Sequence, residues 1–166
     1  MNETNPPYAL PIDRSVRRQD LATELVHPVL QQLYAYWLDK SAGRFAPRRA
    51  DIDPVDFAYA IGWTALIDVV DGGASFRPRV WGGNMKAFSR GDYTGQHRLQ
   101  FIDGDITPIV LEGFRWVVAN RKPSSTLRDI LTAMRHYRFE SVVLPLSDDG
   151  ETVTQLLAAA IPPVGG

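Results

Sequence analysis

One amphipathic helix with clear ends separates two strand-like runs from three others, and this order limits the folds open to the chain. The helix is predicted over residues 108–120, where Pro108 suits the first helical position after a capping Thr107. Its apolar stripe comprises Val110, Leu111, Phe114, Val117 and Val118. Strands on either side of a helical block predict an α+β domain with a five-stranded antiparallel sheet and helices packed on one of its faces.

The strand-like runs are bounded by turn-forming residues. They cover residues 65–70, 75–81, 126–135, 136–146 and 152–160. The turn of Asp71, Gly72 and Gly73 between the first two runs is typical of a β-hairpin. A second turn, residues 147–150, joins the last two runs. Short helical turns are expected over residues 84–89.

The N-terminal part is predicted to lack strands. Residues 1–19 are expected to form a flexible leader, residues 20–43 an N-terminal helix or a kinked helix pair, residues 44–161 the main domain and residues 162–166 a tail. Asp20 is expected to cap a helix that opens at Leu21, and Pro28 either kinks this helix or begins a second one.

The apolar stripe of the N-terminal helix is wider than one buried face needs. Its dimer-interface candidates are Leu21, Leu25, Val29 and Leu33. The expectation is that this helix packs against a second copy of the chain, with about 800 Å² buried on each partner.

Composition narrows the class of protein further. Of 166 residues, 45% are apolar and 22% are charged, which is typical of a globular domain rather than a disordered chain. No run approaches the roughly 20 apolar residues of a membrane span, so no membrane association is expected. The net charge of −1 indicates no general attraction to nucleic acids. Because the N-terminus lacks the apolar core of a signal peptide, cytoplasmic localisation is expected.

The sequence carries no recognisable catalytic signature. It has no cysteine, which excludes cysteinyl-flavin chemistry and thiolate metal sites. Nucleotide-binding loops, hydrolase nucleophile elbows and zinc-protease motifs are also missing. No catalytic residue and no metal site is therefore assigned, and the chain is not expected to be an enzyme.

The three histidines, His27, His97 and His136, are too far apart in the sequence to form a local metal cluster. His97 follows a glycine-bounded loop next to the expected helices. Since a single imidazole can ligate haem, haem is one candidate cofactor and another small molecule is the alternative. The more ordinary interpretation of His97 is a surface-loop residue.

The charged groups have structural explanations. Asp51 and Asp53 are interpreted as capping residues rather than as a catalytic carboxylate pair. Glu140 is expected to form a cross-strand ion pair with an arginine such as Arg128 or Arg135. A local basic patch comprises Arg44, Arg48 and Arg49. Aspartates lie beside this patch, which argues against a nucleic-acid interface.

Several short motifs, in order, resemble a bacterial single-module PAS family found in alphaproteobacteria. The matching segments are Tyr36-Trp37, residues 47–54, residues 66–69, Phe76-Arg77-Pro78-Arg79-Val80-Trp81-Gly82, Thr94-Gly95, and residues 138–147 with Asp149-Gly150 and Val153. Together they span about residues 33–160. The resemblance implies a PAS-like fold with an N-terminal helical extension.

The resemblance also implies a role, because PAS domains are sensory or partner-binding modules. A non-catalytic regulatory module that binds a small molecule or a signalling protein is the first hypothesis. Its ligand-pocket candidates are Trp81, Asn84, Met85, Phe88, His97, Arg115, Trp116 and Tyr137. The alternative is a small enzyme or carrier similar to ketosteroid isomerase, which would hold a carboxylate or a histidine inside an apolar cavity.

Overall fold

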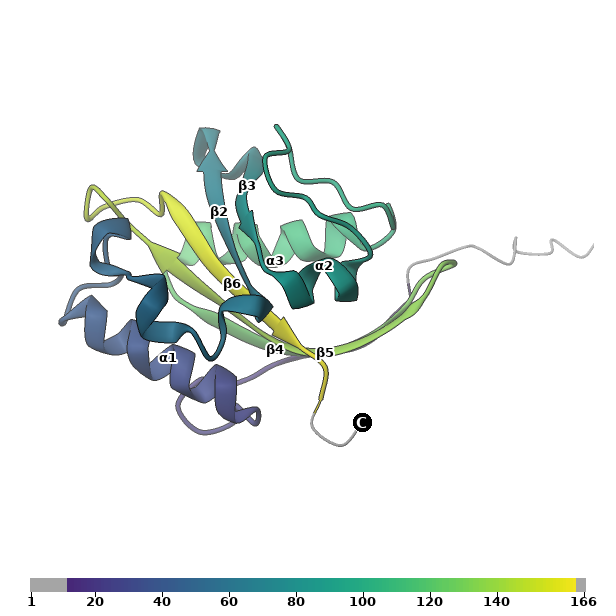
Figure 1. The fold of residues 1–166 in the computed structure, drawn as a ribbon, viewed down its shortest axis with the longest axis horizontal. Helices are drawn as coiled ribbons and strands as arrows, with labels where there is room; N and C mark the ends of the chain where they lie inside the picture. The colour runs from purple at the N-terminus through teal and green to yellow at the C-terminus, as the bar shows by residue number, and fades with distance from the viewer. Residues whose placement is uncertain (1–11, 164–166) are drawn as a thin grey trace, which may run out of the picture.

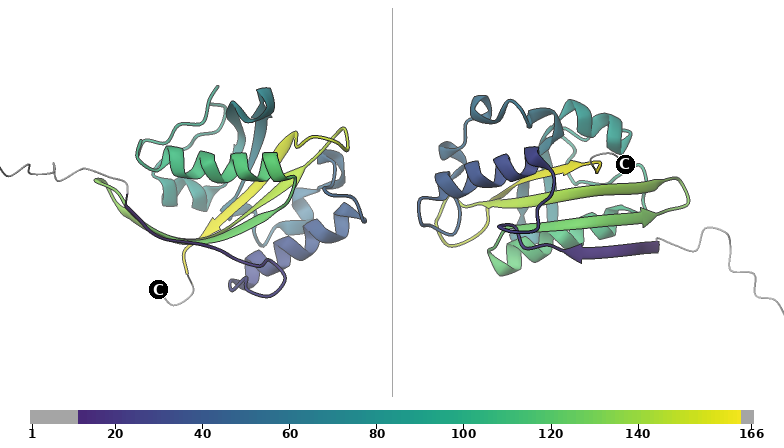
Figure 2. Two further views of the ribbon diagram at one scale, coloured as in Figure 1. Left: turned by 180° about the vertical axis from the view of Figure 1, so that it is seen from behind. Right: turned by 90° about the horizontal axis from the view of Figure 1, so that it is seen from below.

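A computed structural model describes residues 12–163, which build a single curved antiparallel sheet with helices on both faces (Figures 1 and 2). The strands are β1 Ile12–Arg18, β2 Thr64–Val70, β3 Ser75–Trp81, β4 Ser124–Leu131, β5 His136–Leu146 and β6 Gln155–Ile161. Their order across the sheet is β1-β4-β5-β6-β2-β3. The predicted α+β class and the five predicted strands are confirmed, and β1 is a sixth strand at the edge.

Residues 12–163 also form three α-helices and four short 3₁₀ turns. The helices are α1 Pro28–Ser41, α2 Gly83–Ser89 and α3 Thr107–Asn120. Helices α2 and α3 lie over one face, as predicted, whereas α1 lies on the opposite face (Figure 2). Both faces are covered because β5 is apolar on both sides: Phe139 and Val143 enter one core cluster, and Val142 and Leu144 enter the other.

The expected flexible leader is wrong from residue 12 onwards. Residues Ile12–Arg18 form β1, which pairs with residues 126–131 of β4, with Ile12 opposite Leu131 and Arg18 opposite Thr126. The arginines and the lack of apolar periodicity concealed this strand, because an edge strand tolerates polar residues that a central strand does not. Residues 1–11 of the leader and 164–166 of the tail lie outside the described part of the chain.

The predicted helix start at Leu21 is also wrong, and the helix begins at Pro28. Asp20 accepts hydrogen bonds from the backbone N–H groups of Ala22 and Thr23 and so closes a turn instead of capping a helix. Pro28 takes the first position of α1, which was one of the two predicted options. The ring Nδ1 of His27 accepts from the backbone N–H of Val29 and caps the helix.

The start of α3 differs from its prediction in one detail. Ile106 occupies the N-cap position, and no side chain caps the helix there. The hydroxyl of Thr107 instead accepts a hydrogen bond from the backbone N–H of Phe101 at 3.0 Å, and so holds the preceding loop against the helix start. No helix within residues 12–163 is long and apolar enough to cross a bilayer.

Glu140 does not form the expected cross-strand ion pair. Its side chain is 2% exposed and lies on the face of the sheet that α1 covers. One carboxylate oxygen accepts from the backbone N–H of Val26 at 2.9 Å and the other from that of His27 at 2.7 Å. A buried carboxylate thus fixes the segment that leads into α1. It also supplies hydrogen-bond acceptors for two backbone N–H groups that have none within the segment itself.

We predict that Glu140→Gln lowers the free energy of unfolding by about 1–3 kcal/mol, because an amide offers one acceptor where the carboxylate offers two and one buried N–H is left unpaired. Urea denaturation followed by circular dichroism measures the change. Glu151→Gln, in the exposed turn before β6, is the matched control. Equal stability of the two variants would contradict the anchoring role.

Candidate functional site

A cavity lies between the sheet and the helices α2 and α3. It leaves about 90 Å³ in which the centre of a water-sized sphere can move. A single buried water needs roughly 10–15 Å³ measured in this way, so the cavity has room for several waters or for part of an organic molecule. The described core therefore encloses space that side chains do not fill.

Small side chains on the sheet leave this space open. Ala158 and Ala160 of β6 and Ala65 of β2 all line the cavity, and Ala65 lies opposite Ala158 in the strand register. On the helical side, Gly113 of α3 also lines it. Larger side chains at these positions would fill the gap between the two layers, since protein cores are otherwise close-packed.

Aromatic side chains surround one end of the cavity. They are Trp81, Phe88, Phe101, Phe114, Tyr137 and Phe139. The ring of Phe88 makes edge contacts with those of Tyr137 and Phe139, with centroids 6.1 Å and 5.6 Å apart. Trp81 contacts Phe101 in the same way at 5.7 Å. Such edge-to-face packing gives this end a rigid apolar wall.

Polar side chains line the other end. The hydroxyls of Thr126 and Ser141 lie 2.8 Å apart and share a hydrogen bond. The side chains of Arg18 and Arg128 also line the cavity. Arg18 is exposed, and its guanidinium lies 3.7 Å from the ring centre of Trp116 on α3, which places it at the cavity mouth. Partial burial lowers the pKa of Arg18 below its ordinary value.

The structure brings half of the predicted pocket residues to the cavity. Trp81, Met85, Phe88 and Tyr137 line it. The other four candidates, Asn84, His97, Arg115 and Trp116, lie outside the lining.

Each of these four residues has a different position. Asn84 is exposed near Gly62, where a Cβ built on the glycine would lie 2.7 Å from the amide nitrogen. His97 is exposed in the loop before α3. Arg115 donates to the carbonyl of Gly73 at 2.9 Å. Trp116 lies below Arg18.

The polar end of the cavity was missed from the sequence. From the sequence, Arg18 is assigned to a flexible leader, Thr126 and Ser141 are assigned to strands, and Arg128 is offered as an ion-pair partner of Glu140. The available signal was the strand register: Arg18 pairs with Thr126, and Thr126 pairs with Ser141, so the three side chains project from one face of the sheet.

Two buried carboxylates bear on the possibility of catalysis. Glu140 faces away from the cavity, as described above. Asp103 is 5% exposed and accepts from the hydroxyl of Thr132 at 2.6 Å and from that of Tyr137 at 2.7 Å. Burial and, after it, the hydrogen bond to Asp103 raise the pKa of Tyr137 well above its ordinary value, so this phenol stays protonated. Among the described side chains that line the cavity there is no carboxylate.

The histidines do not supply the cavity with a metal ligand in the described part of the chain. His27 caps α1, His97 is exposed, and His136 contacts Asp129. None of the three lines the cavity. Within residues 12–163, no group of three or more potential ligands gathers around a common point.

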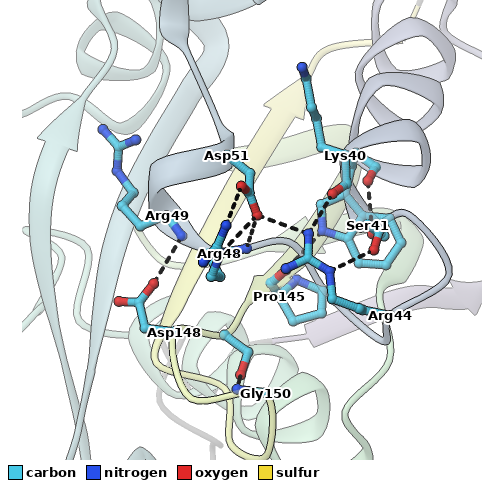
Figure 3. Close-up of polar contacts among 11 residues, drawn as sticks. Lys40, Ser41, Arg44, Arg48, Arg49, Asp51, Pro145, Asp148 and Gly150 are labelled. Carbon is cyan, nitrogen blue, oxygen red and sulfur yellow. Dashed lines mark hydrogen bonds and ion pairs between the residues drawn. The ribbon is translucent and has the colours of Figure 1, made fainter.

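The predicted basic patch is engaged in local contacts in the segment that follows α1 (Figure 3). Asp51 accepts from the guanidinium of Arg44 at 2.9 Å and from that of Arg48 at 3.2 Å, and also from the backbone N–H of Arg48. These hydrogen bonds, first of all that of the Arg48 side chain, hold the pKa of Asp51 well below its usual range. Asp148 accepts from the backbone N–H of Arg49 and ties this loop to the β5–β6 turn.

Comparison with known proteins gives one match. A protein-family model described as a PAS domain matches residues 25–160, which is most of the chain. The matched segment contains all of the first core cluster's buried residues, nearly all of the second's, the three described α-helices, strands β2 to β5 and β6 up to residue 160, and it leaves out β1. No curated protein and no solved structure matches this chain.

We predict that Tyr137→Phe destabilises the domain by about 1.5–3 kcal/mol, because the buried carboxylate of Asp103 then keeps the hydroxyl of Thr132 but loses that of the phenol. Thermal unfolding and urea denaturation both measure this change. Tyr59→Phe, at an exposed tyrosine, is the control and should unfold as the wild type does. If the two variants are equally stable, the phenol–carboxylate contact contributes nothing to the fold.

Proposed function

This chain belongs to the PAS domain family, and we propose that it is a regulatory module that senses a small molecule in the cavity between the sheet and the helices α2 and α3. PAS domains are in general sensory and regulatory modules, and that class supports the proposal. The observation that carries it is the cavity, which alanines and a glycine keep open inside an otherwise packed core. We propose no catalytic step for this site.

The position of β5 supports a route from the cavity to the outer surface. Ser141 lines the cavity, and the adjacent Glu140 holds the backbone of Val26 and His27 on the other face. Because successive residues of a strand point to opposite faces, a ligand that displaces β5 at Ser141 also displaces the anchor of α1. Such coupling requires that the ligand binds the two states with different affinity.

The ketosteroid-isomerase-like alternative receives less support. It required a carboxylate or a histidine aimed into the cavity, and the described lining has neither. Asp103 approaches this role most closely, but it accepts two hydroxyl hydrogen bonds at the edge of the site. Tyr137 lies between Asp103 and the cavity space and covers the carboxylate with its own hydroxyl.

We further propose that the module acts through partners, with a second copy of the chain bound across α1 and a signalling protein as the reader. The sequence-based interface needs revision, because Leu25 and Leu33 are buried in the core beneath α1. Leu21 and Val29 are partly buried against the same core. The apolar side chains on the outside are Val26, just before α1, at 62% exposure and Leu38 at 48%.

We predict that Ala158→Leu abolishes ligand binding and leaves the fold intact, because three added carbons enter the open space. A thermal-shift screen of metabolites and denaturing mass spectrometry of the purified protein identify what the wild type binds. Ala119→Leu, on the exposed side of α3, is the matched control and should bind as the wild type does. Unchanged binding in Ala158→Leu, or no ligand for the wild type, would contradict a sensory cavity.

We predict that the chain sediments as a dimer at high micromolar concentration and that Leu38→Glu shifts it towards the monomer, because a charge replaces an apolar contact at the interface. Sedimentation velocity measures both states. Gln32→Glu, another exposed position on α1, is the control. A wild type that stays monomeric throughout the concentration range would contradict the dimer.

A further inference from the structure

The charge of the cavity lining has one sign. The lining contains two arginines, Arg18 and Arg128, and none of its described side chains is an aspartate or a glutamate. Among the described side chains, no carboxylate lies within ion-pair distance of Arg18, and its guanidinium contacts the ring of Trp116 instead. A cation partly removed from water without a carboxylate partner favours an anion at the same place.

Hydroxyl groups lie in line with this cation. Arg18 of β1, Thr126 of β4 and Ser141 of β5 are consecutive partners across three strands. A guanidinium followed by two hydroxyls therefore crosses the sheet as one row on the cavity side. Both kinds of group donate hydrogen bonds to an oxyanion, and the guanidinium can do so with two parallel N–H groups.

Arg128 extends the polar end towards α3. It lies opposite Phe139 in the register, next to the row of Thr126 and Ser141. A Cβ on Gly113 would lie 3.4 Å from its Nη2, so α3 passes this guanidinium at the one type of residue that has no side chain.

Apart from Ser89 and Ser124, the rest of the lining is largely apolar. The rings of Phe88, Tyr137 and Phe139 and the side chains of Ile106 and Val110 form this apolar wall, and it begins at Phe139, opposite Arg128. A ligand that fills the whole cavity must therefore have an apolar body and an anionic end. A purely polar anion would leave the aromatic wall against water, and a neutral apolar molecule would leave the guanidinium of Arg18 without an anion.

We propose that this cavity binds an amphipathic organic carboxylate, with its apolar body against the aromatic wall and its carboxylate among Arg18, Arg128 and the hydroxyls of Thr126 and Ser141. This ligand class rests on the proposed ligand-binding function and makes it specific. Planar recognition of a carboxylate by a guanidinium explains why arginine rather than lysine stands here. The stacking of Arg18 on Trp116 holds the guanidinium plane at the mouth before the ligand arrives.

Three probes with the same apolar body test the charge preference: octanoate, 1-octanol and octylamine. Isothermal titration calorimetry on the full chain measures their affinities. The expected order is octanoate first, about tenfold tighter than octanol, with octylamine weakest. Arg18→Gln should weaken octanoate about tenfold and leave octanol unchanged.

Arg17→Gln is the matched control. Arg17 is the neighbour of Arg18 on the same strand, but its side chain contacts Glu24 and does not line the cavity. If Arg18→Gln unfolds, judged by circular dichroism, Arg128→Gln replaces it and the same loss is expected. Octanol or octylamine binding as tightly as octanoate would overturn the anionic ligand while leaving a ligand-binding cavity. An equal loss in Arg17→Gln would overturn the role of Arg18. A wild type that binds none of the three, but binds a neutral or cationic metabolite that Ala158→Leu rejects, would overturn this proposal alone.

Discussion

The carboxylate of Glu140 decides how the N-terminal segment joins the sheet. It holds the backbone N–H groups of Val26 and His27 at the point where the chain turns into α1. Pro28 can open the helix only because the preceding turn is fixed, and α1 then buries Leu30, Leu33 and Trp37 against β5 and β6. The indole nitrogen of Trp37 donates to the carbonyl of Pro145 at 2.8 Å and closes the other end of this contact.

With α1 fixed to one face, the two faces of the sheet differ in what they can do. The face under α1 is filled by branched aliphatic side chains such as Val142, Leu144 and Leu157. The face under α3 carries both aromatic side chains and alanines, and the cavity lies between this face and the helix. Because side chains alternate along each strand, a single run such as β6 supplies Leu157 to the packed face and Ala158 to the cavity.

Much of this fold could be predicted from the sequence, wherever local patterns decide the structure. The β2–β3 hairpin, α3 and the strands after it follow from turn residues, caps and periodicity within one segment. Local patterns left open whether Pro28 kinks the N-terminal helix or begins it, because Glu140, more than a hundred residues later in the chain, holds the residues before it. The strand β1 was hidden for the same reason: its hydrogen-bond partner is β4.

The residues of the candidate site also differ in whether a local sequence pattern could predict them. Trp81, Met85, Phe88 and Tyr137 could be predicted because large side chains beside the expected helices reach the space below them. Arg115 and Trp116 were misplaced by a helix rotation of about one residue, the usual limit of a periodicity argument. Arg18 and Thr126 enter the cavity only through the pairing of β1 with β4, which no local pattern contains.

The open space itself has a thermodynamic consequence. Residual cavities destabilise a core by about 24 cal/mol per Å³, so a void of 90 Å³ costs about 2 kcal/mol when it is empty. Larger residues at Ala158, Ala160 or Gly113 would recover part of that free energy, and the polar row at Thr126 and Ser141 would be unnecessary in a dry core. The small residues and the hydroxyls that line the cavity are both explained by a site that water or a ligand with a polar end fills. A molecule that binds only the folded state increases the free energy of unfolding with the logarithm of its concentration. The same alanines that weaken the packing of the free protein therefore make its stability respond to a ligand.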